Sequence, residues 1–235
     1  MKIDLGSPIE YNKDGLYKRI EKLNNIYPIK FDTGVDFGAG KGAYSIFLSG
    51  KVKSLTAFDL NWNNLTKIKN HPEGSNIKLV ITSGSKTCFK ADSFDSLFAI
   101  EVLEHLDDIH AGIKEIKRIL RDKGIAYITV PNKYFPLETH HVYMFNKAMD
   151  GRFIPFLSMF DWIHNKIGSS RRFSVKSLSS YFEKEGFEML GYDYLMPPFD
   201  NFKSGRKIIK PFTEILERSF LRFLGANIAV VFRKR

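Results

Sequence analysis

The chain has few of the features that direct a protein into a membrane or an oxidising compartment. Its single cysteine, Cys88, cannot form an internal disulfide or a thiolate metal site, and we expect an inert thiol on a surface loop. No apolar run approaches the roughly 18 residues of a membrane-spanning helix. The first fifteen residues, MKIDLGSPIEYNKDG, lack the apolar centre of a signal peptide. We therefore expect a cytoplasmic protein.

Acidic residues are outnumbered by basic ones. The chain has 36 Lys and Arg against 26 Asp and Glu, a net charge of +10, which attracts nucleic acid, anionic lipid or acidic small molecules equally. The segment from Lys203 to the C-terminus is both basic and rich in Phe and Ile, and residues 149–168, MDGRFIPFLSMFDWIHNKIG, are rich in aromatics. Two interpretations stay open: peripheral contact with an anionic membrane, or a small core formed where the two segments pack together.

Apolar strands alternate with amphipathic helices along most of the chain. Leu16, Ile20, Leu23 and Ile26 have helical spacing. Strands are predicted at 33–37, 54–60, 76–82, 93–100 and 125–130, with helices at 43–49, 61–70 and 107–120. A further helix is predicted between an N-cap at Ser174 and a stop at Gly186, followed by strands at 187–195 and 226–234. This rhythm predicts an α/β, doubly wound fold with a mostly parallel seven-stranded sheet.

A glycine-rich stretch, VDFGAGKGAYS, joins the first of these strands to a helix. Gly38, Gly40 and Gly42 permit positive φ angles and the close approach of a ligand, and the helix that follows offers free N–H groups. A tight turn without a ligand is the alternative. The spacing is neither G-x-G-x-x-G nor the G-K-[ST] ending of a phosphate-binding loop.

Two acids suggest which ligand this loop binds. Asp36 stands just before the glycines, where a carboxylate would repel a pyrophosphate and favour a cation. Asp59 ends the second predicted strand about twenty residues on, where a carboxylate can accept hydrogen bonds from ribose hydroxyls. A ribose with no phosphate and an attached positive charge describes S-adenosylmethionine.

From about Val35 to Val130 the sequence resembles the class I S-adenosylmethionine-dependent methyltransferases, in the branch of small-molecule enzymes of the ubiquinone and menaquinone type. The motifs are VDFGAGKGAYSIFLS, LTAFDLN, DSFDSLFAIEVLEHLDD and IKRILRDKGIAYITVPN, with a weaker match at RRFSVKSLSSYFEKEGFEML. The resemblance implies a Rossmann-like methyltransferase fold and S-adenosylmethionine as cofactor. It implies that a single domain spans residues 1–235, with an N-terminal helical segment (1–30), a cofactor-binding core (31–131), a lid or substrate insertion after strand 5 (132–173) and a C-terminal part (174–235) with a basic aromatic insertion at about 197–224.

The resemblance also implies roles for individual residues. The methionine part of the cofactor would lie along the loop, the ribose on Asp59, the adenine beside Leu60, and the amino group at the backbone of Glu101. The family often has Gly-Asp-Ala after the third strand, and the matching position here is Ser83, so we expect weaker adenine contact. The implied cofactor-binding residues are Asp36, Gly38, Gly40, Gly42, Asp59, Leu60, Ser83 and Glu101.

These acids also have structural interpretations. Asp36 is a possible buried turn former, and Asp59 a possible N-cap for the helix that begins at NWNNL. For Asp59 we favour the ribose role. For Glu104 and His105 in EVLEHL we favour a structural role, in which their side chains bond to nearby backbone.

Methyl transfer to oxygen benefits from a general base, and histidine is well suited to it. Glu138, His140 and His141 follow the fifth predicted strand, at the carboxyl edge of the sheet. We expect His141 to be the base and Glu138 its orienting partner. The alternative is that these residues only cap or pack the lid.

Some acceptors are disfavoured. The Asn-Pro-Pro-aromatic motif of amino-methylating nucleic-acid enzymes is absent after the fourth strand, and Cys88 is poorly placed to be a nucleophile, so nucleic acid is an improbable partner. We expect transfer to a hydroxyl, less readily to an amine or carbon, of a small or lipid-linked acceptor. The alternatives are a catalytically silent S-adenosylmethionine-binding partner or sensor, and a nucleic-acid methyltransferase.

Overall fold

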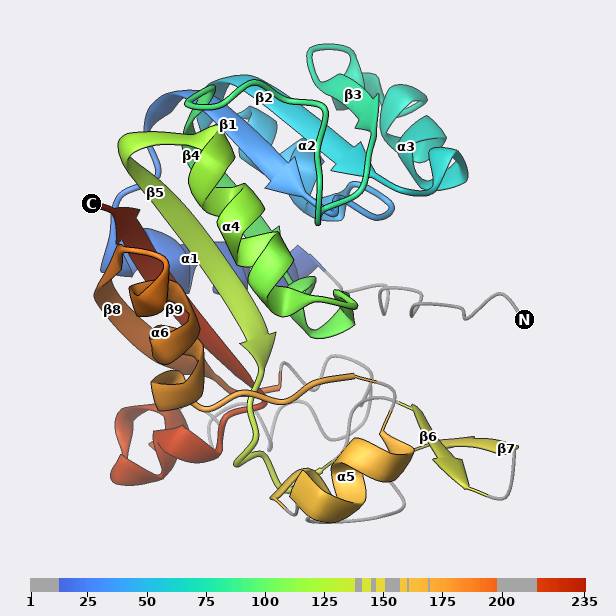
Figure 1. Ribbon diagram of the computed structural model, residues 1–235, viewed down its shortest axis with the longest axis vertical. Helices are drawn as coiled ribbons and strands as arrows, with labels where there is room; N and C mark the ends of the chain where they lie inside the picture. The colour runs from blue at the N-terminus through green and yellow to red at the C-terminus, as the bar shows by residue number, and fades with distance from the viewer. Residues whose placement is uncertain are drawn as a thin grey trace.

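A computed structural model describes residues 13–137, 141–144, 147–150, 157–159, 161–168, 170–197 and 215–235 (Figure 1). Its centre is a seven-stranded sheet in the order β3-β2-β1-β4-β5-β9-β8. The strands are β1 (Phe31–Phe37), β2 (Val52–Asp59), β3 (Lys78–Ile81), β4 (Phe94–Ile100), β5 (Leu120–Pro131), β8 (Phe187–Leu195) and β9 (Asn227–Lys234). The pairs among β1 to β5 are parallel, whereas β9 lies antiparallel between β5 and β8. The predicted doubly wound, mostly parallel sheet is confirmed.

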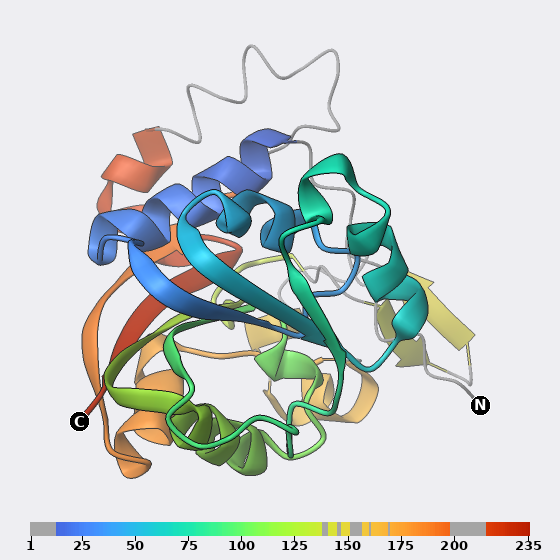
Figure 2. The same cartoon turned by 90° about the horizontal axis from the view of Figure 1, so that it is seen from above.

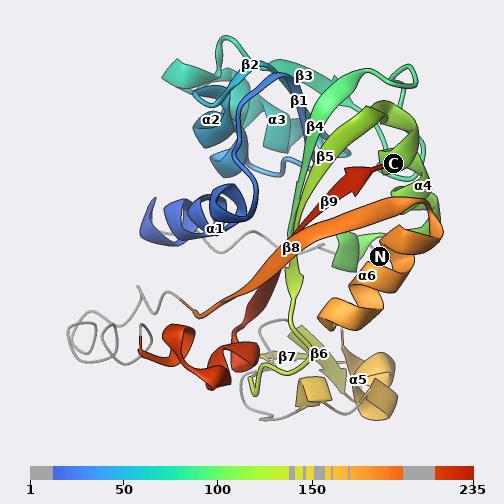
Figure 3. The same ribbon diagram turned by 90° about the vertical axis from the view of Figure 1, so that its left-hand side faces the viewer.

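Helices cover both faces of the sheet (Figure 3). One face carries α1 (Lys13–Ile26), α2 (Ala43–Ser49) and α3 (Trp62–Lys69), and the other carries α4 (Ile109–Ile119) and α6 (Val175–Lys184). Each face has its own buried core: Ile20 and Leu23 of α1 lie in one, and Phe182 of α6 stacks on Phe232 of β9 in the other, with ring centroids 4.1 Å apart. Burial of one such side chain contributes about 1.5–3 kcal/mol.

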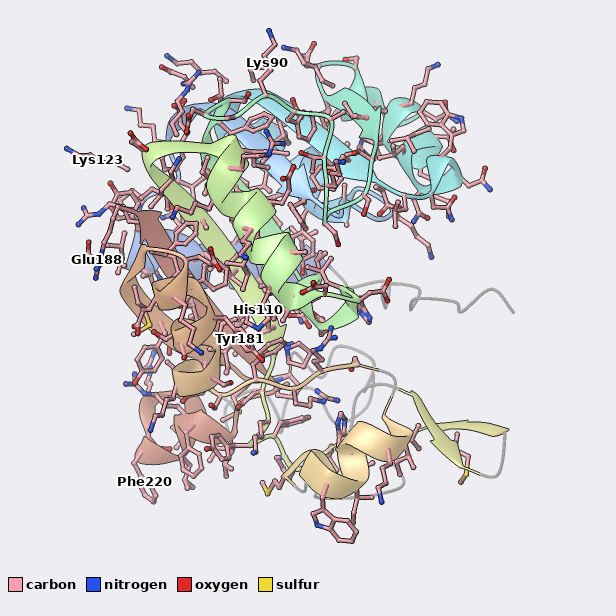
Figure 4. All side chains as sticks on the ribbon, viewed as in Figure 1. Lys90, His110, Lys123, Tyr181, Glu188 and Phe220 are labelled. Atoms are coloured by element: carbon pink, nitrogen blue, oxygen red, sulfur yellow. The ribbon has the colours of Figure 1, made fainter. Side chains whose placement is uncertain are left out.

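Short local interactions set the ends of these helices. The hydroxyl of Ser174 accepts a 3.1 Å hydrogen bond from the amide of Ser177, which confirms the predicted N-cap of α6. The Asp108 carboxylate accepts a 3.1 Å bond from the amide of Ala111 at the start of α4. The two helices meet where His110 contacts Tyr181 edge to face (Figure 4), at a centroid distance of 5.0 Å.

The connection from β3 to β4 crosses one face of the sheet as a loop with no helix (Figure 2). Phe89 in this loop packs between Phe58 and Phe94, with centroid distances of 5.7 and 5.1 Å. Its aromatic contacts take the place of a helix on this part of the sheet. Cys88 lies in the same loop and is exposed, as expected.

The segment after β5 lies beyond the carboxyl end of that strand, next to the 3₁₀ helix η5 (Phe220–Leu224) (Figures 1 and 3). Its described parts include α5 (Asp161–Ile167) and a hairpin of β6 (His141–Met144) and β7 (Lys147–Asp150). The insertion therefore includes a two-stranded antiparallel unit that the sequence did not predict. Within the residues that the structure describes, no helix is long and apolar enough to cross a membrane.

Candidate functional site

The three glycines of the loop after β1 differ in whether a side chain would fit at their positions. All have positive φ angles: 74° at Gly38, 52° at Gly40 and 85° at Gly42. A Cβ atom at Gly38 would lie 2.7 Å from Val102, and one at Gly42 would lie 2.1 Å from Ile68 of α3. A Cβ atom at Gly40 would meet no atom within 4 Å apart from its chain neighbours. Packing thus accounts for Gly38 and Gly42, whereas Gly40 faces open space that a ligand can enter.

The carboxylate of Asp59 lies beside this opening, at the end of β2. Its Oδ2 accepts a 2.9 Å hydrogen bond from the amide of Gly40, and its Oδ1 accepts from the amide of Asn61 at 2.8 Å and from the side chain of Asn64 at 3.3 Å. The N-cap of α3 is Asn61, not Asp59. A carboxylate has about four acceptor positions, so Oδ2 retains one for a ribose hydroxyl.

Apolar side chains are exposed where β2 and β3 end. Leu60 is 65% exposed, Ile81 is 55% exposed and Trp62 is 44% exposed. Ile81 is the register partner of Asp59, so it lies next to the expected ribose position. A flat apolar ring bound here would cover these surfaces. The sequence predicted Leu60 as a residue beside the adenine but did not predict Ile81. The signal that could have identified Ile81 is its position at the carboxyl end of an edge strand.

Ser83 is engaged within its own turn after β3. Its hydroxyl accepts a 3.3 Å hydrogen bond from the amide of Ser85, and its backbone pairs with that of Lys86. The hydroxyl oxygen has a second lone pair, and its proton is free to rotate. A contact from Ser83 to adenine therefore stays a prediction.

Asp36 is buried at the end of β1, with 2% of its surface exposed. It accepts a 2.5 Å hydrogen bond from the hydroxyl of Ser45 on α2. Burial, with a smaller contribution from the charge of Asp59, raises the pKa of Asp36 from 3.8 to about 7, although the Ser45 bond opposes the shift. A positive charge placed nearby would favour the ionised carboxylate.

Glu101, directly after β4, has a left-handed backbone with φ 57°. Its carboxylate accepts hydrogen bonds from Thr129 of β5 at 2.8 Å and from the side chain of Asn227 of β9 at 2.7 Å. Its amide donates to the Thr129 carbonyl at 3.0 Å. Non-glycine residues rarely adopt this conformation, and such strain concentrates at functional sites.

The buried guanidinium of Arg19, on α1, reaches the residues that bind the Glu101 carboxylate. Only 5% of Arg19 is exposed, and it donates to the side chain of Asn227 at 2.9 Å and to the hydroxyl of Tyr44, on α2, at 3.2 Å. Sequence reasoning missed this residue because the spacing of α1 marks only its apolar positions. Its contacts join the helix after the glycine loop to the residues that hold Glu101.

The carboxyl group of Glu104 is also buried, within the 3₁₀ helix η2 (Leu103–His105). In the part of the chain that the structure describes, neither of its oxygens has a hydrogen-bond partner, and the Nε2 of His105 lies 4.0 Å from Oε1. The backbone amide of Glu104 itself still favours the ionised side chain, so the expected bond to nearby backbone stays a prediction. Burial, and then the charge of Glu101, raise the pKa of Glu104 well above its usual value.

The structure describes little of the residues that are predicted to act on the acceptor. Glu138 and His140 lie outside the described residues. The backbone of His141 begins β6 and pairs with Asp150, and nothing is described of its side chain. Their catalytic roles stay predictions.

A metal site and a surface hollow are two other places where predicted site residues could lie, and neither involves those that the structure describes. Across the described ranges, no group of three or more His, Cys, Asp and Glu side chains is arranged to hold a metal ion. A hollow lined by Thr33, Ser54, Thr56 and Lys78 lies toward the amino ends of the strands, and no predicted site residue lines it. The candidate site therefore lies at the carboxyl ends of β1, β2 and β4.

Comparison with known proteins is consistent with this geometry. Residues 35–128 match the methyltransferase domain family. A ubiquinone biosynthesis O-methyltransferase of Pelagibacter ubique (strain HTCC1062) is 28% identical over 126 residues, which cover 53% of this chain and 52% of that protein. Another, of Glaesserella parasuis serovar 5 (strain SH0165), is 24% identical over 120 residues, which cover 48% of this chain and 50% of that protein. The chain spans about half the length of these relatives.

Solved structures share the fold over most of the chain. An S-adenosylmethionine-dependent methyltransferase from Mesorhizobium loti has a TM-score of 0.63 at 15% identity, covering 90% of this chain and 95% of its own. A possible histamine N-methyltransferase from Thermotoga maritima has a TM-score of 0.62 at 16% identity, covering 94% and 89%. At these identities the likeness shows the fold alone.

Residues 35–128, which include the glycine loop, therefore match the methyltransferase domain family, and the fold around them is shared with solved S-adenosylmethionine-dependent methyltransferases. Over about half of its length the chain is similar in sequence to ubiquinone biosynthesis O-methyltransferases.

Proposed function

We propose that this protein transfers the methyl group of S-adenosylmethionine to a hydroxyl of a small or lipid-linked acceptor. The observation that carries the proposal is the open space at Gly40 beside the Asp59 carboxylate. The similarity to O-methyltransferases supports a hydroxyl as the acceptor group, rather than an amine or carbon.

Each part of the cofactor has a matching group in the site. Asp59 would hold the ribose, and the exposed Leu60 and Ile81 would cover the adenine. The backbone at Gly38, Gly40 and Glu101 would hold the methionine part, together with the buried guanidinium of Arg19. When bound, the cofactor supplies a methyl group activated by a positively charged sulfur.

Asp36 is suited to stabilise that positive charge. Its carboxyl is buried next to the glycine loop, and water is excluded from it. In such surroundings the attraction between opposite charges is stronger than in water. The carboxylate would therefore favour a cationic ligand over a neutral or anionic one.

The acceptor would bind beyond the carboxyl ends of β4 and β5. Residues 132–173 follow β5 directly and would act as a lid that orients the acceptor and excludes water. His141 would remove the hydroxyl proton, with Glu138 orienting it and His140 beside it. A bound acceptor held close to the methyl group needs little else from the protein, because the leaving group is already activated.

Apolar side chains near this end of the molecule support access from a membrane surface. Phe220 is 84% exposed and extends from the body of the protein (Figure 4), and Trp162 of α5 is 68% exposed. Basic residues, including Arg218 and Arg222, flank Phe220 along the chain. Aromatic side chains beside cations are suited to an anionic bilayer surface, where a lipid-linked acceptor would lie.

The proposal is tested by calorimetric titration with S-adenosylmethionine and S-adenosylhomocysteine, followed by transfer of labelled methyl groups to hydroxyl-bearing quinone precursors, glycans and lipids. We expect one-to-one binding of both cofactor forms and label in one hydroxyl class. Binding without transfer to any acceptor would favour a silent partner or sensor, and label in RNA or DNA would favour a nucleic-acid enzyme. Absence of binding would contradict the proposal.

A further inference from the structure

Glu104 is a buried acid that the proposed function does not use. Its side chain has no exposed surface, and among the described residues both carboxyl oxygens are without a hydrogen-bond partner. Buried polar groups are nearly always paired, and a carboxyl left unpaired is costly. Such a group is explained if a ligand, or a change in charge nearby, stabilises it during function.

The turn that carries Glu104 lies against the glycine loop. Val102, two residues before it, occupies the space where a side chain at Gly38 would lie. On the other side, the amide of Arg171 donates a 3.3 Å hydrogen bond to the Glu104 carbonyl, which joins the turn to the segment that leaves the insertion. Glu104 thus lies between the proposed cofactor loop and the proposed lid.

Charged groups face Glu104 from each element packed around it. Glu101 from the end of β4 disfavours its ionisation, whereas Arg172 from the segment after the insertion and Arg19 from α1 favour it. His105 neighbours it on the same turn. Burial lowers the pKa of Arg172 to about 10, against the attraction of Glu104 and Glu101. Burial and the charge of Glu101 favour the neutral form of Glu104 over the pull of the two arginines, and an added positive charge would shift it toward its ionised form.

We propose that Glu104 exchanges a proton in step with the charge of the cofactor: it loses a proton when cationic S-adenosylmethionine binds and carries the acceptor's proton when neutral S-adenosylhomocysteine remains. This inference rests on the proposed function. In the reaction the bond from methyl to the acceptor oxygen forms, and the bond from methyl to sulfur breaks with its electron pair left on sulfur. His141 takes the hydroxyl proton first and passes it on, and the proton ends on the Glu104 carboxylate, so one positive and one negative charge disappear together.

The test compares protons released on binding, measured by calorimetry at pH 7 in buffers of different ionisation enthalpy. We expect wild-type protein to release more protons with S-adenosylmethionine than with S-adenosylhomocysteine. In Glu104→Gln both should still bind, and the difference should fall to the part that Asp36, whose pKa is about 7, contributes. Thermal stability of this variant without cofactor should be close to that of wild type, because a neutral amide replaces a carboxyl group that is itself neutral before the cofactor binds.

Two variants serve as matched controls. Glu115 is a buried glutamate of α4 that accepts hydrogen bonds from Thr87 and Arg118, so Glu115→Gln should lose stability and keep the proton difference. Asp36→Asn removes the buried carboxyl next to the glycine loop. If the difference is undiminished in Glu104→Gln and vanishes in Asp36→Asn, the proton belongs to Asp36 and the inference is wrong.

The wild-type result alone can also overturn the inference. Binding of both cofactor forms with equal proton release contradicts the role of Glu104 and leaves the proposed function intact, even if Glu104→Gln does not fold. A loss of stability in Glu104→Gln as large as in Glu115→Gln would show a structural role. Failure of wild-type protein to bind either form contradicts the proposed function itself.

Discussion

The amide of Gly40 donates a 2.9 Å hydrogen bond to the carboxylate of Asp59, which ties the glycine loop after β1 to the end of β2. The bond places the open side of the loop beside a carboxylate oxygen that has a free acceptor position. Two segments nineteen residues apart in sequence therefore form one binding surface.

Asp59→Ala should weaken S-adenosylmethionine binding by about 1–3 kcal/mol, because the ribose hydroxyls and the Gly40 amide both lose an acceptor. Calorimetric titration measures the change. Asp32→Ala is the control, since Asp32 is an exposed acid paired with Lys53 at the other end of β1. Equal affinity in Asp59→Ala and wild type would remove the ribose assignment.

Gly40→Ala and Gly42→Ala should fail in different ways. At Gly40 an alanine meets no atom but must adopt positive φ, at a cost of about 1–2 kcal/mol, and its methyl group enters the space proposed for the cofactor. At Gly42 the overlap with Ile68 adds about 1–3 kcal/mol. Thermal melts should show a larger loss of stability in Gly42→Ala than in Gly40→Ala. Titrations should show that, in Gly40→Ala, the loss of cofactor affinity is large compared with the loss of stability. The reverse order would contradict the site.

The unfolding free energy should report the pKa of Asp36. This carboxyl ionises near pH 3.8 when unfolded and near pH 7 when folded, so the folded state binds more protons between these values. Relative to Asp36→Asn, wild type should therefore lose stability as pH rises from about 4 to about 7, by about 1.4 kcal/mol per pH unit at most. Above pH 7 the difference should be constant. Denaturant melts of both proteins across this range provide the measurement, and a flat difference would contradict the raised pKa.

His141→Ala should slow methyl transfer about 100-fold or more if this residue is the general base. Cofactor affinity should be unchanged, because the proposed cofactor residues lie on α1, at the carboxyl ends of β1 to β4 and in the loops that follow them, outside the insertion. The rate is measured with the acceptor that the labelling screen identifies. His140→Ala is the neighbouring control, and wild-type rates in His141→Ala would show that the histidine only packs the insertion.

Phe220→Ser and Trp162→Ser should each reduce co-sedimentation with anionic vesicles, because these exposed aromatic side chains would enter the bilayer surface. Binding should fall with added salt, since basic residues contribute to it. Tyr17→Ser is a control, because Tyr17 is 54% exposed on α1 and is not part of the proposed membrane surface. Absence of salt-sensitive binding by wild type would exclude the membrane contact.

Local patterns were sufficient for most of the fold. The boundaries of α2, α6 and β8 follow from a glycine stop, a serine N-cap and an apolar run, which act within a few residues. The hairpin of β6 and β7 was not predicted, because a short two-stranded unit has little apolar alternation to mark it.

The sequence by itself determined the strand and helix alternation, the glycine loop and the two acids at strand ends, because these depend on neighbouring residues and on the fixed geometry of parallel strands. Only the tertiary structure decided which glycine faces open space, that Arg19 reaches Asn227, and that the buried carboxyl of Glu104 has no hydrogen-bond partner among the described residues. Those properties depend on side chains from distant segments, such as Val102 beside Gly38 and Ile68 beside Gly42. Their positions are set by packing across the whole sheet, and no local pattern encodes them.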